Sequence, residues 1–186
     1  MSYRPITDMW ILARAKLKGG KKYYGAYPGG FPERARALLG VSLNDPLLHV
    51  CGGMARHYPY KRGFGPKDKT LDIDPATEPD FLRDARQPFP LQLLQSGEEP
   101  WPAILMDPPY SEEDANAYAF GSSYYPLPNQ LLRNALAVVR PGGRVGLIHY
   151  ILPQPPRDAI FVAAVGVLTG YNNRIRIYSV FERPVE

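Results

Sequence analysis

Residues 103–110, AILMDPPY, decide the fold: four apolar residues run directly into an acidic residue, two prolines and a tyrosine. A short apolar run bounded by turn residues is typical of a strand that a sheet buries on both faces. The two prolines end that strand and hold the following turn stiff. Ligands of open α/β sheets bind beyond the carboxyl ends of the strands, so we expect Asp107 and Tyr110 to stand at a ligand site.

Similar apolar runs and two helical patterns lie on either side of this segment. Each run begins or ends at glycine, proline or aspartate, and the helical patterns repeat apolar residues every three or four positions. Apolar strands that alternate with helices predict an α/β fold, with helices on both faces of a mostly parallel sheet. The predicted strands are 47–51 (LLHVC), 70–73 (TLDI), 103–106 (AILM) and 144–150 (RVGLIHY), and the predicted helices are 31–39 and 129–139.

The carboxyl-terminal third has a different pattern. Residues 160–168 are apolar throughout and fit either a strand or a helix, whereas apolar side chains alternate with polar ones over 174–181 (RIRIYSVF). A period of two indicates a strand with two unlike faces. We therefore expect an antiparallel strand, added at the edge of the parallel sheet, close to the carboxyl terminus.

Length and composition favour one globular domain. The chain has 186 residues, of which 45% are hydrophobic and 22% charged, while 21 prolines and 17 glycines predict many loops. We expect residues 1–186 to form a single catalytic domain without a separate target-recognition domain. Within it we distinguish an N-terminal segment (1–30), a basic loop (54–69) and a loop after DPPY (111–128).

Charge and cysteine content narrow the function classes. A net charge of +4 suits a polyanionic partner, although a solvated basic surface explains it equally well. Cys51 is the only cysteine, which excludes an intramolecular disulfide, and it fits a buried small residue better than a nucleophile. The three histidines form no metal-ligand pattern with it, so no metal is expected. Because the longest apolar stretch, 159–168, is far short of the ~20 residues of a membrane span, we expect a soluble, cytoplasmic protein.

The DPPY turn suits the chemistry of an exocyclic amine. The lone pair of such an amine is delocalised into its ring and attacks an electrophile poorly. The Asp107 carboxylate and the Pro108 carbonyl can accept both amino hydrogens and so localise the lone pair, after which the reaction needs mainly positioning. Tyr110 offers a flat face for stacking. The alternative is a proline turn after a strand, with a tyrosine at the surface.

DPPY and its neighbours resemble the S-adenosylmethionine-dependent methyltransferases, specifically those that methylate amino groups in DNA. The catalytic motif of that family is D/N/S-P-P-Y/F/W, and the resemblance extends from Pro46 to about Pro184. It implies a Rossmann-like class I methyltransferase fold and S-adenosylmethionine as cofactor. It also implies transfer to an exocyclic amino nitrogen, that of adenine in DNA, with a catalytic set made of Asp107, Pro108, Pro109 and Tyr110.

The resemblance also implies a set of cofactor-binding residues. Residues 48–53 (LHVCGG) occupy the place of the family's glycine-rich loop, Asp74 that of the acidic residue on the ribose, and Asp84 that of the acidic residue near the adenine. His49 departs from the family pattern because it replaces an acidic residue, and Met54 departs because it replaces a glycine. Tyr27 either belongs to an N-terminal cofactor segment or packs on the core. The implied cofactor residues are His49, Cys51, Gly52, Gly53, Asp74, Asp84 and Tyr27.

A paired adenine is inaccessible inside a duplex, so the target must be flipped out or single-stranded. Tyr110 would stack on it and aromatic residues of the loop 111–128 would close over it. The basic loop would contact phosphates, or it is simply solvated. Without a recognition domain, specificity is low, comes from these loops, or comes from a partner or second subunit. The candidate nucleic-acid-binding residues are Arg56, Lys61, Arg62, Lys67, Tyr124 and Tyr125.

Two other functions stay open. The first is methylation of RNA or of a protein amide, although the glutamine-modifying enzymes tend to have Asn in place of Asp107. The second is a non-catalytic relative that binds nucleic acid or a partner, which the altered glycine loop supports and the intact DPPY opposes.

Overall fold

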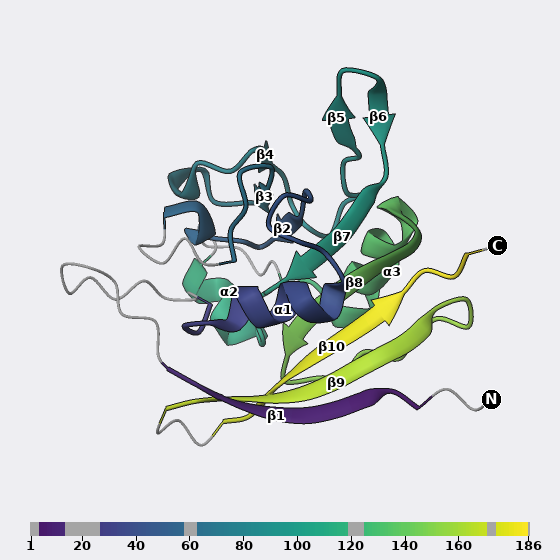
Figure 1. Cartoon of the computed structure of the whole chain (residues 1–186). Helices are drawn as coiled ribbons and strands as arrows, with labels where there is room; N and C mark the ends of the chain where they lie inside the picture. Colours follow the sequence, from purple (N-terminus) through teal and green to yellow (C-terminus); the bar gives the residue numbers. More distant parts are fainter. Residues whose placement is uncertain (1–3, 14–26, 58–62, 119–124, 171–173, 186) are drawn as a thin grey trace.

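A computed structural model describes residues 4–13, 27–57, 63–118, 125–170 and 174–185. In these residues an eight-stranded sheet has the order β1-β9-β10-β8-β7-β2-β3-β4, and β5 and β6 pair as a separate hairpin that projects from one end of the molecule (Figure 1). The strands are β1 (Ile6–Leu12), β2 (Leu48–Val50), β3 (Lys69–Asp72), β4 (Phe81–Leu82), β5 (Gln92–Leu94), β6 (Gly97–Glu99), β7 (Trp101–Met106), β8 (Val139–His149), β9 (Ile160–Thr169) and β10 (Arg176–Glu182).

The sheet is parallel except at one strand. β7 pairs in parallel with both β2 and β8, while β10 pairs antiparallel with β8 on one side and with β9 on the other. The prediction of a mostly parallel α/β sheet with an antiparallel C-terminal strand is therefore confirmed. Its predicted place at the edge is wrong, since β9 and β1 lie beyond β10. β10 is therefore paired along both edges, and Tyr178 to Phe181, whose side chains alternate between the two faces of the sheet, are all buried.

One helix covers each face of the sheet, and both begin at a proline near their first turn. The helix α1 (Phe31–Leu39) lies over β8 and β10 and buries Phe31, Ala35 and Leu39 in one apolar cluster (Figure 1). On the opposite face α3 (Pro128–Val138) buries Leu131 and Ala135 in a second cluster with β2 and β7. Apolar residues at helical spacing thus face the sheet from both sides, as the sequence pattern predicts.

The structure adds elements that the sequence analysis did not predict. Residues 6–12 form β1, which pairs in parallel with β9, and Trp10 packs against Phe31 and Tyr178. The loop expected at 111–128 contains the short helix α2 (Glu112–Tyr118), and the basic loop contains a 3₁₀ turn at Ala55–His57. None of the helices in the described part of the chain is long and apolar enough to cross a membrane.

Candidate active site

The DPPY turn follows β7 and is attached to the neighbouring strand. The Asp107 amide donates to the Val50 carbonyl at 3.1 Å, and the Tyr110 hydroxyl donates to Asp107 Oδ1 at 2.6 Å. Packing of protein around the carboxyl group raises the pKa of Asp107 to about 7, while the Tyr110 hydrogen bond and the positive charge of Arg176 act in the opposite direction. Near neutral pH Asp107 therefore exists in both protonation states.

His149, at the end of β8, contacts the DPPY turn at Pro109 and Tyr110. Its Nδ1 accepts from the Ile151 amide at 2.9 Å, and a hydrogen bond joins the ring to the Pro109 carbonyl. Burial lowers the pKa of His149 to about 4, so the imidazole is neutral at pH 7. The Tyr110 ring meets it edge-on, with ring centroids 5.4 Å apart, and lies 4.7 Å from the Tyr150 ring. The only sequence signal for this role was the position of His149 at a strand end.

The glycine loop after β2 makes a tight turn. Cys51 and Gly53 have φ angles of 53° and 48°, and the Gly53 amide donates to Asp72 Oδ2 at 2.9 Å. A Cβ at Gly52 would lie 3.0 Å from the Cβ of His49 and 3.2 Å from its carbonyl oxygen, so a side chain at this position would force its neighbours to move. The loop thus brings backbone close to the carboxyl edge of the sheet.

Of the two aspartates in LDIDP, the structure places Asp72 nearer the glycine loop. Asp72 ends β3, and its carboxylate holds the amides of Gly53 and Asp74, while burial raises its pKa. Asp74 instead caps the 3₁₀ turn Pro75–Thr77 by accepting from the Ala76 amide at 2.8 Å. The predicted cofactor residue Asp74 therefore has a local structural task. Asp72, which the sequence analysis passed over, stands at the end of the strand next to the glycine loop.

Asp84 follows β4, and its carboxylate is paired with Arg86 at 2.6 Å. Burial alone would raise the pKa of Asp84, but hydrogen bonds from Arg86 lower this pKa below its usual value. Gln130 and Asn134 of α3 hold this loop by donating to its carbonyls.

Cys51 lies where the loops after four neighbouring strands converge. Burial raises the pKa of its thiol, and the negative charges of Asp72, Asp107 and Asp84 raise it further. A thiol with this pKa is protonated at neutral pH, which agrees with the prediction that Cys51 is no nucleophile. Because these three carboxylates follow β3, β7 and β4, the carboxyl edge of the sheet carries an acidic group on each side of the glycine loop.

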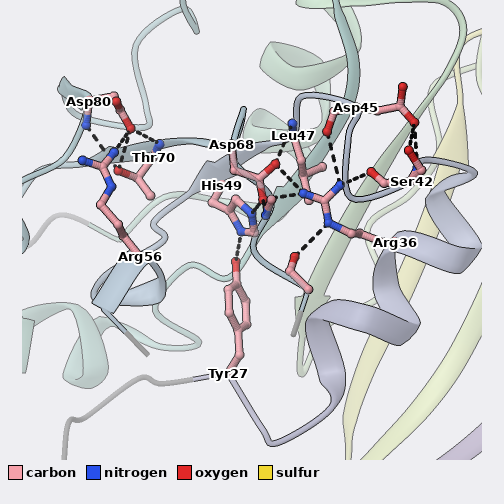
Figure 2. Close-up of polar contacts among 12 residues, drawn as sticks. Tyr27, Arg36, Ser42, Asp45, Leu47, His49, Arg56, Asp68, Thr70 and Asp80 are labelled. Atoms are coloured by element: carbon pink, nitrogen blue, oxygen red, sulfur yellow. Dashed lines mark hydrogen bonds and ion pairs between the residues drawn. The ribbon is translucent and has the colours of Figure 1, made fainter. Parts of the chain in front are cut away.

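A buried polar network lies beneath the glycine loop (Figure 2). His49 Nε2 lies 3.0 Å from Asp68 Oδ2, and its Nδ1 lies 3.4 Å from the Tyr27 hydroxyl. Asp68 also pairs with Arg36 of α1 and accepts from the amides of Leu47 and Gly65. Arg36 in turn donates to three loop carbonyls, those of Gly63, Ser42 and Asp45. The charges of this network are therefore matched inside the protein.

This network changes how two predicted cofactor residues are interpreted. His49 has no exposed surface and Tyr27 is 2% exposed, so both point into the core rather than toward a ligand. Tyr27 packs on Phe31 with ring centroids 5.6 Å apart, which is the alternative of an aromatic residue packed on the core. His49 and Tyr27 are therefore core residues beside the glycine loop, and a contact of either with a cofactor stays a prediction.

Of the four predicted phosphate-binding cations, the structure describes Arg56 and Lys67. Arg56 is paired with Asp80 (Figure 2). Lys67 lines a cavity of about 780 Å³ together with Trp101, at the amino end of β7. Six strand residues at ~3.3 Å each separate that end from Asp107 by about 20 Å. Lys67 therefore lines a different part of the molecule from the DPPY turn. Lys61, Arg62 and Tyr124 lie outside the described residues.

A second cavity, of about 590 Å³, opens beside the DPPY turn. It is bounded by the loop after β8, the start of α2 and the approach to β10, and its walls carry charges of both signs. The Tyr125 hydroxyl lies 3.4 Å from His149 Nε2, so the end of the 111–128 segment comes back to the DPPY turn. The lining residues are Ser111, Glu113, Asp114, Tyr150, Arg174 and Ile175.

Among the described residues, no group of three or more His, Cys, Asp or Glu side chains is placed to hold a metal ion.

Comparison with known proteins identifies the fold. No protein-family model matches the chain, and no curated protein matches it. TrmN from Thermus thermophilus is similar over 86% of this chain, with a TM-score of 0.59 and 21% identity, and the chain spans about half (50%) of the length of TrmN. The protein yhhF from Escherichia coli is similar over 94% of this chain and 99% of its own, with a TM-score of 0.53 and 11% identity.

A third structure contains a methyltransferase with its reaction product. The 1,6-didemethyltoxoflavin-N1-methyltransferase from Burkholderia thailandensis, solved with S-adenosylhomocysteine, covers 84% of this chain and 80% of its own, with a TM-score of 0.50 and 13% identity. The mostly parallel sheet with one antiparallel strand matches these structures in fold. The chain therefore has the Rossmann-like fold of the class I methyltransferases.

Proposed function

We propose that this protein transfers a methyl group from S-adenosylmethionine to the exocyclic amino nitrogen of a nucleic-acid base, adenine in DNA being the first candidate. The observation that carries the proposal is the position of Asp107. Asp107 follows β7 beside the glycine loop, and its amide donates to the carbonyl of Val50, the last residue of β2. Its carboxyl group has a pKa of about 7. A carboxylate acceptor and a loop suited to a cofactor thus occupy adjacent strand ends.

The residues at the carboxyl edge suit S-adenosylmethionine. Gly52 lets the glycine loop pack closely on His49, where a side chain would push the loop out of place, and Asp72 stands at the end of the next strand, where a carboxylate can accept ribose hydroxyls. Asp84, one strand further, can accept an adenine amino group if Arg86 yields one oxygen. Bound there, the cofactor supplies an electrophilic methyl group on a sulfonium.

Asp107 would activate the target amine. Its ionised form accepts one amino hydrogen on Oδ2 while Tyr110 holds Oδ1, and the Pro108 carbonyl accepts the second. The nitrogen lone pair then forms the new N–C bond as the S–C bond breaks and its electrons return to sulfur. The extra proton on nitrogen passes to Asp107 or to solvent, which balances the reaction. His149 keeps the turn in place by its hydrogen bond to the Pro109 carbonyl.

The target would enter through the cavity of about 590 Å³ beside the turn. Tyr110 and Tyr150 offer aromatic faces there for an extruded base, and Tyr125 borders the same site through His149. The mixed charge of the cavity walls is a poor phosphate site, so we infer that phosphate contacts lie outside it. Target specificity is low, or a partner or second subunit supplies it.

The test is transfer of labelled methyl groups from S-adenosylmethionine to duplex DNA, single-stranded DNA and RNA in parallel. Incorporation into DNA that the Asp107→Ala variant loses by at least 100-fold, with cofactor affinity in calorimetry unchanged, supports the proposal. Incorporation into RNA alone would move the substrate to RNA with the same mechanism. No incorporation and no cofactor binding would overturn the enzyme and leave a binding protein on this fold.

A further inference from the structure

Arg176 approaches the catalytic turn from the antiparallel strand β10. Its guanidinium carbon lies 5.4 Å from the centroid of the Tyr110 ring, a distance at which a cation is attracted to the ring face. Nη1 donates to Thr169 Oγ1 at 3.1 Å. Nε is buried and, within the described part of the chain, has no hydrogen-bond partner. A cation is thus held over the ring whose hydroxyl binds Asp107.

The direction of β10 makes this approach possible. Because β10 runs antiparallel to β8, its first residues lie beside the carboxyl end of β8, and Ile177 pairs with His149. A parallel strand would begin at the opposite edge of the sheet, far from Asp107. Thr169, at the end of β9, fixes the guanidinium from the other side.

The positive charge of Arg176 acts on the carboxyl group of Asp107, whose ionised form is disfavoured by burial. Burial raises the pKa of Asp107, and Arg176 is the positive charge that opposes this effect. An unpartnered Nε is a cost that the fold retains at this position, which is typical of functional sites. A purely structural arginine would instead be expected to satisfy its donors.

We propose that Arg176 is a positioning residue for methyl transfer: it holds the Tyr110 ring and provides the positive charge that keeps Asp107 able to accept the target amine. The inference rests on the proposed function for the role of Asp107 in the reaction. The contact between Arg176 and the Tyr110–Asp107 pair, however, has consequences that are measurable in the protein without any substrate.

The experiment follows the Asp107 carboxyl resonance by carbon-13 NMR as a function of pH, with Asp107→Asn used to assign it. Arg176→Met should raise the midpoint by about one pH unit, as loss of a nearby opposite charge does. It should move the acidic limb of the kcat/KM profile for methyl transfer by the same amount. Arg176→Lys, which keeps the charge, should return the midpoint most of the way. Arg157→Met, the loss of an exposed arginine, should leave it unchanged.

An Asp107 midpoint that does not move in a folded Arg176→Met protein overturns the inference. If that variant fails to fold, Arg176→Gln carries the same expectation, because it keeps a donor for Thr169 but no charge. An unmoved midpoint there has the same meaning. A midpoint that moves in a protein without methyl transfer or cofactor binding would uphold the contact between Arg176 and the Tyr110–Asp107 pair, but would overturn the proposed function and with it the role of Arg176 in methyl transfer.

Discussion

At the scale of single residues, the site depends on groups held in states that water would not favour. Burial raises the pKa of Asp107 to about 7 and lowers that of His149 to about 4. Gly52 is a separate case, because a Cβ there would lie only 3.0 Å from the Cβ of His49. Such perturbed groups often gather at functional sites, since the protein must stabilise them elsewhere. Two predictions concern this scale.

Asp107→Asn should change how stability depends on pH. The folded pKa of about 7 is above the unfolded value of ~3.9, so the folded state binds more protons between these pH values. Stability from this group is complete below pH 4 and is lost as pH rises to 7. The variant, which cannot ionise, should therefore match the wild type at pH 4 and exceed it by roughly 1–3 kcal/mol at pH 8.

Urea unfolding at a series of pH values measures this difference in stability. The contribution of His149 to the pH dependence cancels, because both proteins contain that residue. Asp158→Asn, an exposed position, serves as the control and should follow the wild type throughout. A constant offset between Asp107→Asn and the wild type at every pH would contradict the burial of Asp107.

Gly52→Ala should weaken the cofactor site with a modest loss of stability. The new Cβ would stand 3.0 Å from the Cβ of His49, which the network of Asp68 and Tyr27 holds in place. We expect at least a tenfold loss of S-adenosylmethionine affinity in calorimetry and about 1–3 kcal/mol of stability. Gly29→Ala, whose Cβ would make ordinary contacts at 3.7 Å, is the matched control. Equal affinities in both variants would remove Gly52 from the cofactor site.

At the scale of elements, the buried network joins the helix α1 to the paired strands β2 and β3. Arg36 belongs to α1, His49 to β2, and Asp68 immediately precedes β3 (Figure 2). Asp68 also accepts from the amide of Leu47, directly before β2, and from the amide of Gly65, in the segment between β2 and β3. The position of the glycine loop is therefore set by a helix and a loop as well as by its own strand.

Asp68→Asn should destabilise the protein by about 3–5 kcal/mol, because the variant leaves Arg36 as an uncompensated buried charge. Thermal and urea unfolding measure the loss, and a lower cofactor affinity should accompany it if the network supports the loop. Glu98→Gln, on the exposed β5–β6 hairpin, is expected within about 0.5 kcal/mol of the wild type. A loss below 1 kcal/mol for Asp68→Asn would show that water or another group replaces the carboxylate.

At the scale of the whole molecule, the two edges of the parallel sheet carry different features. The carboxyl edge has the acidic groups and the DPPY turn, while the amino edge has the cavity lined by Lys67, Lys69 and Arg140. A net charge of +4 is therefore no guide to where a polyanion would lie.

Lys67→Ala should leave methyl transfer to nucleic acid unchanged within about twofold, because Lys67 lines a cavity at the amino end of β7, and the length of β7 separates that end from Asp107 by about 20 Å. Steady-state transfer at two salt concentrations measures this, with Asp107→Ala as the inactive reference. A clear loss with Lys67→Ala, together with a shallower salt dependence, would mean that nucleic acid wraps from one edge of the sheet to the other.

Much of the fold could be predicted because its signals are local. Apolar runs ended by proline or glycine marked the strands that became β2, β3, β7 and β8, and proline at the first turn marked α1. β1 was missed because its alternating pattern of exposed and buried residues includes exposed Met9 and Ile11, which dilutes the signal. The placement of β10 inside the sheet depends on pairing with β9, which no local pattern encodes.

By itself the sequence determined that Asp107 follows a buried strand and that a glycine pair follows another, since chain order and apolar runs establish both. Only the tertiary structure decided which residues meet there. It placed Asp72 against the glycine loop and made Asp74 the cap of a turn, buried His49 and Tyr27 in the core, and brought His149 and Arg176 to the DPPY turn. The physical reason is that burial, charge compensation and strand direction arise from contacts between residues far apart in the chain, and those contacts exist only once the sheet has formed.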